Sequence, residues 1–178
     1  MHYDKHFLQD KRTDLNRETV DQLIRHSLVE DIGKGDITTQ LTIPEAKDIK
    51  AHILAKEDCV VCGIDIAART FELVDKSVEF KAFCREGQKV PKNKIMAVVS
   101  GKARSILNAE RVALNMLILL SGIATKTRAY VDKVEPLKVK ITDTRKTMPG
   151  LRELQKYAVR VGGGYNHRIS LDEMILIK

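Results

Sequence analysis

Residues 141–178, ITDTRKTMPGLRELQKYAVRVGGGYNHRISLDEMILIK, form the most informative part of the sequence. They place five basic side chains around two strand-like segments, a helix and a triple glycine: Arg145, Lys146, His167, Arg168 and Lys178. Arginine offers a planar fork of donors that suits carboxylates and phosphates, and lysine offers a compact positive charge. The stretch therefore predicts a cationic pocket for a ligand that carries several negative charges.

The order of elements in this stretch is typical of a βαβ unit. Residues 139–142 are predicted to form a buried strand, residues 143–147 the loop that leaves its C-terminal end, and residues 174–178 the next strand. With a helix between them, the two strands belong to a parallel sheet or barrel, where ligands bind beyond the strand C-termini. Arg145 and Lys146 are thus predicted to lie where chemistry takes place in such folds.

The helix of this unit is predicted over residues 151–161. Pro149 opens it, Gly162 ends it in a left-handed conformation, and the capping-type stretch SLDE at residues 170–173 precedes the second strand. The inward face of the helix is predicted to hold Leu154, Tyr157, Ala158 and Val161.

The positive charge of the chain is concentrated in the same part. The net charge is +7, and residues 109–178 hold 13 Lys and Arg against 7 Asp and Glu, whereas residues 1–108 hold 18 against 17. A nucleic acid is one partner for such a surplus, but the region lacks the stacking aromatics or basic helix of most nucleic-acid binders. A small anionic ligand is the favoured interpretation.

The first part of the chain is predicted to be an α+β domain over residues 1–108. A helix with Val20, Leu23, Ile24 and Leu28 inward begins after Asn16 or Thr13 and stops before Gly33. The turn-rich EDIGKGDITT, residues 30–39, is expected to be an ordered loop. Short extended runs between Ile49 and Ser100, interrupted by a helix over residues 65–73, predict a sheet.

A second domain is predicted to begin near Asn108, over residues 109–178. It opens with a long, mostly buried helix, or with a pair of helices kinked at Ser121 and Gly122. Arg111 lies in the first turn of this helix, where its charge opposes the helix dipole. Binding of an anion across a subunit interface and ordinary surface exposure both account for that placement.

Three cysteines, Cys59, Cys62 and Cys84, give no disulfide framework and fit a reducing compartment. The pair Cys59 and Cys62 forms a C-x-x-C, but no second pair follows at zinc-site spacing, so small apolar residues at a strand end are favoured over a redox or metal role. The longest apolar run, residues 112–124, is shorter than the ~18 residues that span a bilayer. No membrane span and a cytoplasmic location are expected.

Five blocks of the sequence together resemble the quinolinate phosphoribosyltransferase family, also called nicotinate-nucleotide pyrophosphorylase (carboxylating). They are EDIGKGDITT, ARSILNAERVALNMLILLSGIAT, DTRKTMPGLRELQKYAV, VGGGYNHR and the final LIK. The resemblance covers essentially the whole chain, and TRKT-x-PG-L-R followed by GGG-x-x-HR is its most specific part.

The resemblance implies a reaction of NAD biosynthesis. Quinolinate and phosphoribosyl pyrophosphate would give nicotinate mononucleotide, pyrophosphate and carbon dioxide, with Mg²⁺. Both substrates are strongly anionic, which agrees with the charge distribution of the chain.

The resemblance also implies roles for individual residues. Thr144, Arg145 and Lys146 would bind the quinolinate carboxylates and nearby phosphate, and His167 and Arg168 would complete the pocket. Arg145, Lys146 and Lys178 would be catalytic, and Lys178 would stand at the end of the next barrel strand. Arg111 would reach the active site of the neighbouring subunit in a homodimer or larger assembly. The substrate-binding set is thus Arg111, Thr144, Arg145, Lys146, His167, Arg168 and Lys178.

The family's chains continue beyond the final lysine, so the α/β barrel is expected to be incomplete here, with at most two or three of its eight units present. The magnesium ligands and phosphate loops are expected in strands that this chain lacks, and the chain alone is expected to be inactive. A related ModD-type protein of the same superfamily and a non-catalytic anion-binding fragment remain alternative readings.

Overall fold

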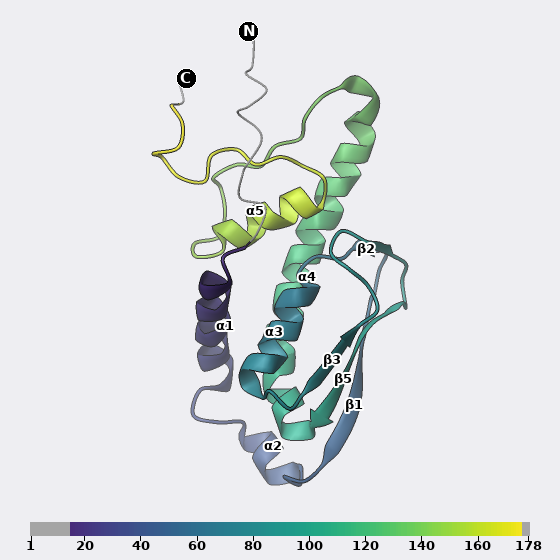
Figure 1. The fold of residues 1–178 in the computed structure, drawn as a ribbon, viewed down its shortest axis with the longest axis vertical. Helices are drawn as coiled ribbons and strands as arrows, with labels where there is room; N and C mark the ends of the chain where they lie inside the picture. The colour runs from purple at the N-terminus through teal and green to yellow at the C-terminus, as the bar shows by residue number, and fades with distance from the viewer. Residues whose placement is uncertain (1–14, 176–178) are drawn as a thin grey trace.

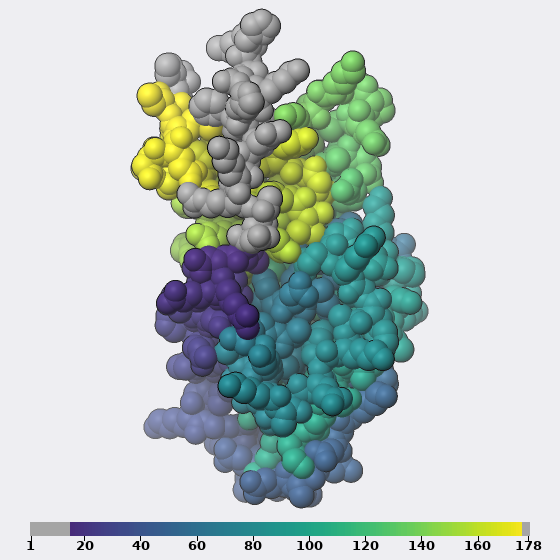
Figure 2. Space-filling view, in the orientation of Figure 1, coloured from purple at the N-terminus to yellow at the C-terminus, as the bar shows by residue number. Residues whose placement is uncertain are grey.

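The structure is a computed structural model that describes residues 15–175. One long helix, α4 (Ala103–Val134), runs through most of it, with a sheet on one side and shorter helices on the other (Figure 1). The segment that follows α4 gathers at one end of the molecule, away from α2 and the sheet (Figures 1 and 2).

The sheet has three antiparallel strands in the order β1-β5-β3, formed by β1 (Asp48–Leu54), β5 (Ile95–Lys102) and β3 (Glu79–Ala82). Two short strands, β2 (Cys59–Val60) and β4 (Lys89–Val90), form a separate antiparallel pair. The predicted extended runs are thereby confirmed as strands, with α3 (Ile64–Val74) between them.

Two apolar clusters hold the layers together. The first lies between the sheet and the helices α3 and α4, and it includes Phe71, Val99 and Ile106. The second lies where α1 (Arg17–Ile32), α4 and α5 (Arg152–Val161) meet. Burial of apolar side chains on two sides explains why α4 is apolar over so much of its surface.

Local signals for the first helix are confirmed. Asn16 caps α1 by accepting a hydrogen bond from the Thr19 backbone N–H at 3.1 Å, and Gly33 ends the helix at φ +55°. The loop expected over residues 30–39 is only partly present. Asp36 accepts from the Thr39 N–H at 2.9 Å and so caps a short helix, α2 (Ile37–Thr42).

Helix α4 begins earlier than predicted and continues as one α-helix past Ser121 and Gly122. Helix α4 passes through Asn108, where the boundary between two domains was predicted. That boundary stays a prediction. With the turn that follows α4, residues 103–137 are long and apolar enough to cross a membrane by length and composition alone. In the structure the helix packs into both apolar clusters. A core helix that is buried on two sides has the same apolar composition as a helix that crosses a membrane.

The strand predicted over residues 139–142 is wrong for most of its length. Val139 is 56% exposed, and the only pairing in the described part of the segment is a parallel bridge between Thr142 and Tyr165. Tyr165 N–H donates to the Ile141 carbonyl at 2.8 Å, and Asp143 N–H donates to the Tyr165 carbonyl at 3.0 Å. Among the described residues, the parallel partner of Thr142 is therefore the segment around Tyr165.

The second predicted strand, over residues 174–178, is not observed where it can be described. Met174 and Ile175 are not in a strand, and the remaining three residues lie outside the described residues. Helix α5 is confirmed, but Gly162 has φ −70°, and the left-handed residue is Gly163 at φ +89°. Gly162 is close-packed against α4 instead, which is its physical reason for being a glycine.

Candidate anion-binding site

Two loops that carry the predicted basic residues lie side by side. Because the bridge between Thr142 and Tyr165 is parallel, the residues that follow each of them leave the bridge at the same end. Asp143 Oδ1 accepts a hydrogen bond from the His167 backbone N–H at 2.8 Å. These contacts join Asp143, directly before residues 144–146, to His167. The βαβ interpretation had expected residues 174–178 as the parallel partner, so the neighbourhood of the two loops comes from the structure, and their shared role in one pocket stays a prediction.

Arg145 has a feature that suits an anion site. Its side chain is half-buried, and its Nε is buried without a hydrogen-bond partner among the residues that the structure describes. A buried donor without an acceptor is costly unless a ligand supplies the acceptor. The beginning of the loop is held by Thr144, whose Oγ1 accepts from the Lys146 N–H at 3.0 Å, while the Lys146 side chain is exposed.

His167 and Arg168 are half-buried, and the backbone of Arg168 binds the imidazole of His167. The Arg168 N–H donates to His167 Nδ1 at 2.9 Å, so a neutral His167 carries its proton on Nε2. The Arg168 guanidinium donates through NH1 to the Met174 carbonyl at 2.6 Å. The imidazole is therefore arranged to offer an Nε2–H donor, and one nitrogen of Arg168 is committed to the next loop.

Three residues that the sequence interpretation missed connect the two loops: Asp143, Lys156 and Asn166. Lys156 Nζ lies 2.6 Å from Asp143 Oδ1, and the exposed fractions of the two side chains are 1% and 7%. The helical period of α5 predicted an apolar face and gave no signal that a lysine would be buried between Leu154 and Ala158. The acid directly before TRK was a usable signal, because an acid beside a cationic pocket requires a partner of its own.

Two predicted residues are not placed with these loops. Arg111 lies on α4 with 61% of its side chain exposed, 4.0 Å from Glu110. Helix α4 meets the triple glycine at Thr127, which is about 24 Å further along the axis at ~1.5 Å per residue. Within one chain Arg111 is thus remote from the loops. Lys178 lies outside the described residues.

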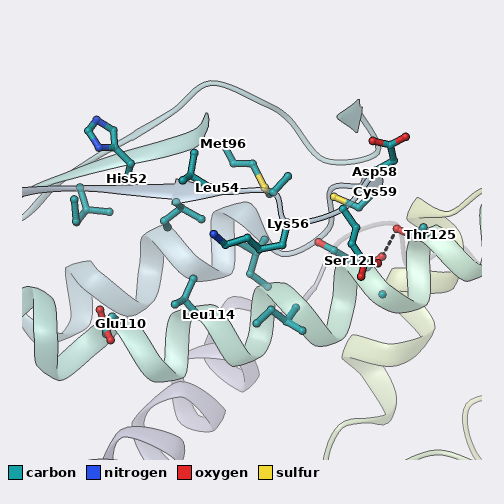
Figure 3. A pocket seen from close by; sticks show the side chains of 18 of the residues that line it. His52, Leu54, Lys56, Asp58, Cys59, Met96, Glu110, Leu114, Ser121 and Thr125 are labelled. Carbon is teal, nitrogen blue, oxygen red and sulfur yellow. Dashed lines mark hydrogen bonds between the residues drawn. The ribbon is translucent and has the colours of Figure 1, made fainter. Parts of the chain in front are cut away.

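An open groove of about 870 Å³ lies elsewhere, between β1, the loop that follows it and one side of α4 (Figure 3). Its lining is mainly apolar, with Leu54, Met96 and Leu114 among the labelled residues, and acids such as Asp58 and Glu110 stand near its rim. None of the predicted substrate-binding residues lines it. The groove does not have the chemistry to hold a polyanion, so the paired loops are the better candidate site.

The described residues do not provide a magnesium site. They contain no group of three or more His, Cys, Asp or Glu side chains that could hold a metal ion. The acid at the paired loops, Asp143, already accepts from Lys156, Asn166 and the His167 backbone. Cys59, Cys62 and Cys84 are free thiols, and burial raises the pKa of Cys62 far above its ordinary value.

Comparison with known proteins identifies the family of this chain. The family model described as the quinolinate phosphoribosyl transferase N-terminal domain matches residues 36–121, and that of the C-terminal domain matches residues 123–178. The chain belongs to the quinolinate phosphoribosyltransferase family. In this family the paired loops lie in the C-terminal domain, and the described part of that domain contains no closed barrel, as expected for an incomplete one.

Relatives of known name are similar over most of this chain. A probable nicotinate-nucleotide pyrophosphorylase (carboxylating) from Synechocystis is 45% identical over 89% of the chain and 54% of the relative, and one from Bacillus subtilis is 43% identical over 92% and 56%. The nicotinate-nucleotide pyrophosphorylase structure from Francisella tularensis matches with a TM-score of 0.87 and 44% identity, over 92% of this chain and 58% of that one. The chain thus spans little more than half the length of these relatives.

Proposed function

We propose that this chain is part of a quinolinate phosphoribosyltransferase that converts quinolinate and phosphoribosyl pyrophosphate into nicotinate mononucleotide, pyrophosphate and carbon dioxide, in NAD biosynthesis. The observation that carries the proposal is the contact between the TRK and HR loops, together with an Arg145 Nε that is buried and has no hydrogen-bond partner within residues 15–175. The names of the relatives support the same activity. Cytoplasmic location is part of the proposal, although some plant relatives are named chloroplastic or mitochondrial.

The residues of the paired loops act by positioning and electrostatics. Arg145 and Lys146 bind the two carboxylates of quinolinate, and Thr144 holds the loop that presents them. His167 Nε2–H and Arg168 donate to the remaining oxygens. The ring nitrogen is then held in line with the ribose carbon that pyrophosphate leaves.

Decarboxylation follows from the same arrangement. Loss of carbon dioxide leaves an electron pair on the ring carbon, and fixed cations close to the ring stabilise that charge until the carbon takes up a proton that comes from solvent. Lys178 is assigned to this cationic set by resemblance. Mg²⁺ is proposed as a cofactor, with ligands that the described residues do not supply.

The active site is proposed to be completed by a second copy of the chain. Arg111, Asn115 and Ile118 lie on one exposed stripe of α4, three to four residues apart, and Ile118 is 67% exposed beside the apolar groove. An exposed stripe of this kind next to an apolar groove is suited to a subunit interface. A second copy seated there would receive Arg111 in its own site.

The test compares Arg145→Ala with Arg25→Ala in the full protein, because Arg25 is an exposed arginine of α1 far from the loops along the chain. Formation of nicotinate mononucleotide is measured at varied quinolinate. Arg145→Ala should raise the quinolinate KM and lower kcat by orders of magnitude, and Arg25→Ala should change neither. Normal kinetics of Arg145→Ala would refute the assignment. Binding of quinolinate without turnover by the full protein would favour a non-catalytic anion-binding role, and preference for a different substrate would favour a ModD-type protein.

A further inference from the structure

The carboxylate of Asp143 is the point at which three donors from two parts of the chain converge. Oδ1 accepts from Lys156 Nζ at 2.6 Å and from the His167 N–H at 2.8 Å, and Oδ2 accepts from Asn166 Nδ2 at 2.5 Å. A carboxylate has room for several such bonds, and charge-assisted bonds are the stronger kind. Asp143 is thus held in one orientation by α5 and by the loop that follows Tyr165.

Lys156 completes the contact with His167. Its Nζ donates to the His167 carbonyl at 2.7 Å as well as to Asp143. The ion pair therefore binds both backbone polar groups of His167, its N–H through Asp143 and its C=O through Lys156. With both groups bound, the peptide planes before and after His167 are fixed, and so is the direction in which its imidazole leaves the backbone.

Asn166 adds a second connection between the loop and α5. Its Nδ2 donates to the Lys156 carbonyl at 2.9 Å as well as to Asp143, and its Oδ1 accepts from Arg160 NH1. The Asn166 side chain is buried. Its amide can have only this orientation, because the nitrogen faces two acceptors and the oxygen faces a donor.

We propose that the Asp143–Lys156 pair is a positioning device that fixes the TRK loop relative to the HR loop, so that their cations meet one quinolinate. Asp143 directly precedes Thr144, and His167 is itself one of the predicted substrate-binding residues. The pair thus connects the first residue of one loop with the backbone of the other. The inference rests on the proposed function for the identity of the ligand.

Charge gives the pair a second effect. Since Lys156 and Asp143 neutralise each other in the interior, neither adds to nor subtracts from the cationic face that binds the anion. A lone Asp143 carboxylate would repel quinolinate and would offer Arg145 an acceptor inside the protein. Replacing Lys156 alone should therefore weaken anion binding even where the fold survives.

Stability alone does not account for such a pair. A buried ion pair is often no more stabilising than two well-packed apolar residues, whereas removing one partner leaves an uncompensated buried charge. The apolar replacement Asp143→Leu with Lys156→Met therefore separates the two roles. It removes the buried charges but cannot make the bonds to His167 and Asn166.

The experiment measures thermal stability and quinolinate kinetics of the full protein, at a temperature where every variant is folded. The single variants Asp143→Asn and Lys156→Met are expected to lower Tm and to raise the quinolinate KM roughly 10- to 100-fold, as for small misplacements of binding groups. The double variant Asp143→Leu/Lys156→Met is expected to recover much of the Tm but not the KM. Recovery of KM together with Tm would overturn the proposal and leave the pair a purely structural role.

A matched control comes from another ion pair. Asp21 lies 2.5 Å from Arg69 and joins α1 to α3, outside both loops. Asp21→Asn should lower Tm without changing KM or kcat. A KM change of the same size in this variant would mean that general destabilisation explains the effect, which would also overturn the proposal.

Amide hydrogen exchange separates this inference from the proposed function. If the wild-type protein does not act on quinolinate, the proposed function fails, yet the positioning contacts are still measurable. Asp143→Asn should then speed exchange over residues 143–147 and 164–168 together and leave α1 unchanged. Unaltered exchange in the two loops would overturn the positioning role whatever the ligand is.

Discussion

Gly162 and Ala124 are in such close contact that a Cβ on Gly162 would lie 2.6 Å from the Ala124 carbonyl oxygen. The same Cβ would lie 2.7 Å from the Cβ of Thr127, one turn further along α4. The end of α5, and with it the HR loop, is therefore placed by direct backbone packing against the long helix.

Gly162→Ala is expected to destabilise the chain by about 1–3 kcal/mol, because the added methyl group meets backbone that cannot move without shifting α4 or α5. Gly122→Ala is the matched control, since a Cβ there has nothing within 4 Å and alanine favours the helix by about 0.5–1 kcal/mol. Chemical denaturation measures both. Equal effects of the two substitutions would contradict the packing of Gly162.

The parts of this fold that could be predicted from the sequence are those set by interactions between residues close together in the chain. Asn16, Gly33 and Pro149 act on their own neighbours, and the helices next to them were predicted with small errors at the ends. The TRK loop was predicted from its place after a strand-like segment, whereas the HR residues were placed in the same pocket only by the resemblance, so the site itself stays a prediction. The strand predicted over residues 139–142 was wrong because a strand requires backbone hydrogen bonds to a neighbouring strand. Among the described residues, this segment pairs only through the bridge between Thr142 and Tyr165.

Lys156 shows why part of the site was missed. Its position on α5 is a helical one among apolar neighbours, and lysine is rarely buried unless a partner neutralises it. The partner, Asp143, lies 13 residues earlier in the sequence, and the fold brings it next to Lys156. Gly162 was assigned the wrong role for a similar reason, since the close approach of α4 cannot be inferred from the glycine itself.

The ion pair between α1 and α3 predicts a specific dependence on pH. Hydrogen bonds from Arg69 at 2.8 and 2.5 Å lower the pKa of the Asp21 carboxyl below its ordinary value. A lowered pKa in the folded state stabilises the protein above the unfolded pKa of about 3.9, and this contribution is lost as the pH falls through the folded pKa. Because the pair is partly exposed, it contributes at most about 1 kcal/mol.

The stability difference between wild type and Asp21→Asn should therefore be present at pH 7 and should shrink when the pH is lowered below the ordinary aspartate range. Urea denaturation of both proteins, at pH 7 and at a pH below the ordinary aspartate range, measures this difference in the free energy of unfolding. A difference that is the same at low pH would show that the Asp21 carboxylate is not the stabilising group.

The thiol of Cys62 is expected to react slowly. Burial raises its pKa, and the thiolate is the reactive form, so little of it is present near neutral pH. Cys59 is only half-buried, although burial raises its pKa too. Alkylation with iodoacetamide at pH 8, followed by mass spectrometry, should modify Cys62 last. Rapid modification of Cys62 would instead support a redox role for the C-x-x-C.

Sharing of the site between subunits predicts complementation. Arg111→Ala and Arg145→Ala should each be nearly inactive. When the two variants are mixed in equal amounts, about half of the dimers contain one subunit of each, and one of the two sites in such a dimer has both arginines. The mixture should therefore regain about a quarter of wild-type activity. Arg145→Ala mixed with His167→Ala is the control, since both of these residues come from one chain. Recovery in the control, or none in the Arg111 mixture, would contradict a shared site.

The most direct measurement of the central claim is calorimetric binding of quinolinate to the full protein, with nicotinate as the comparison ligand. Two carboxylates gripped by the paired loops should bind more tightly than one, so quinolinate should bind at least roughly tenfold more tightly than nicotinate, and Arg145→Ala should remove most of this difference. Equal binding of the two ligands, or an unchanged preference in Arg145→Ala, would contradict the claim that the TRK and HR loops form a site for a dianion.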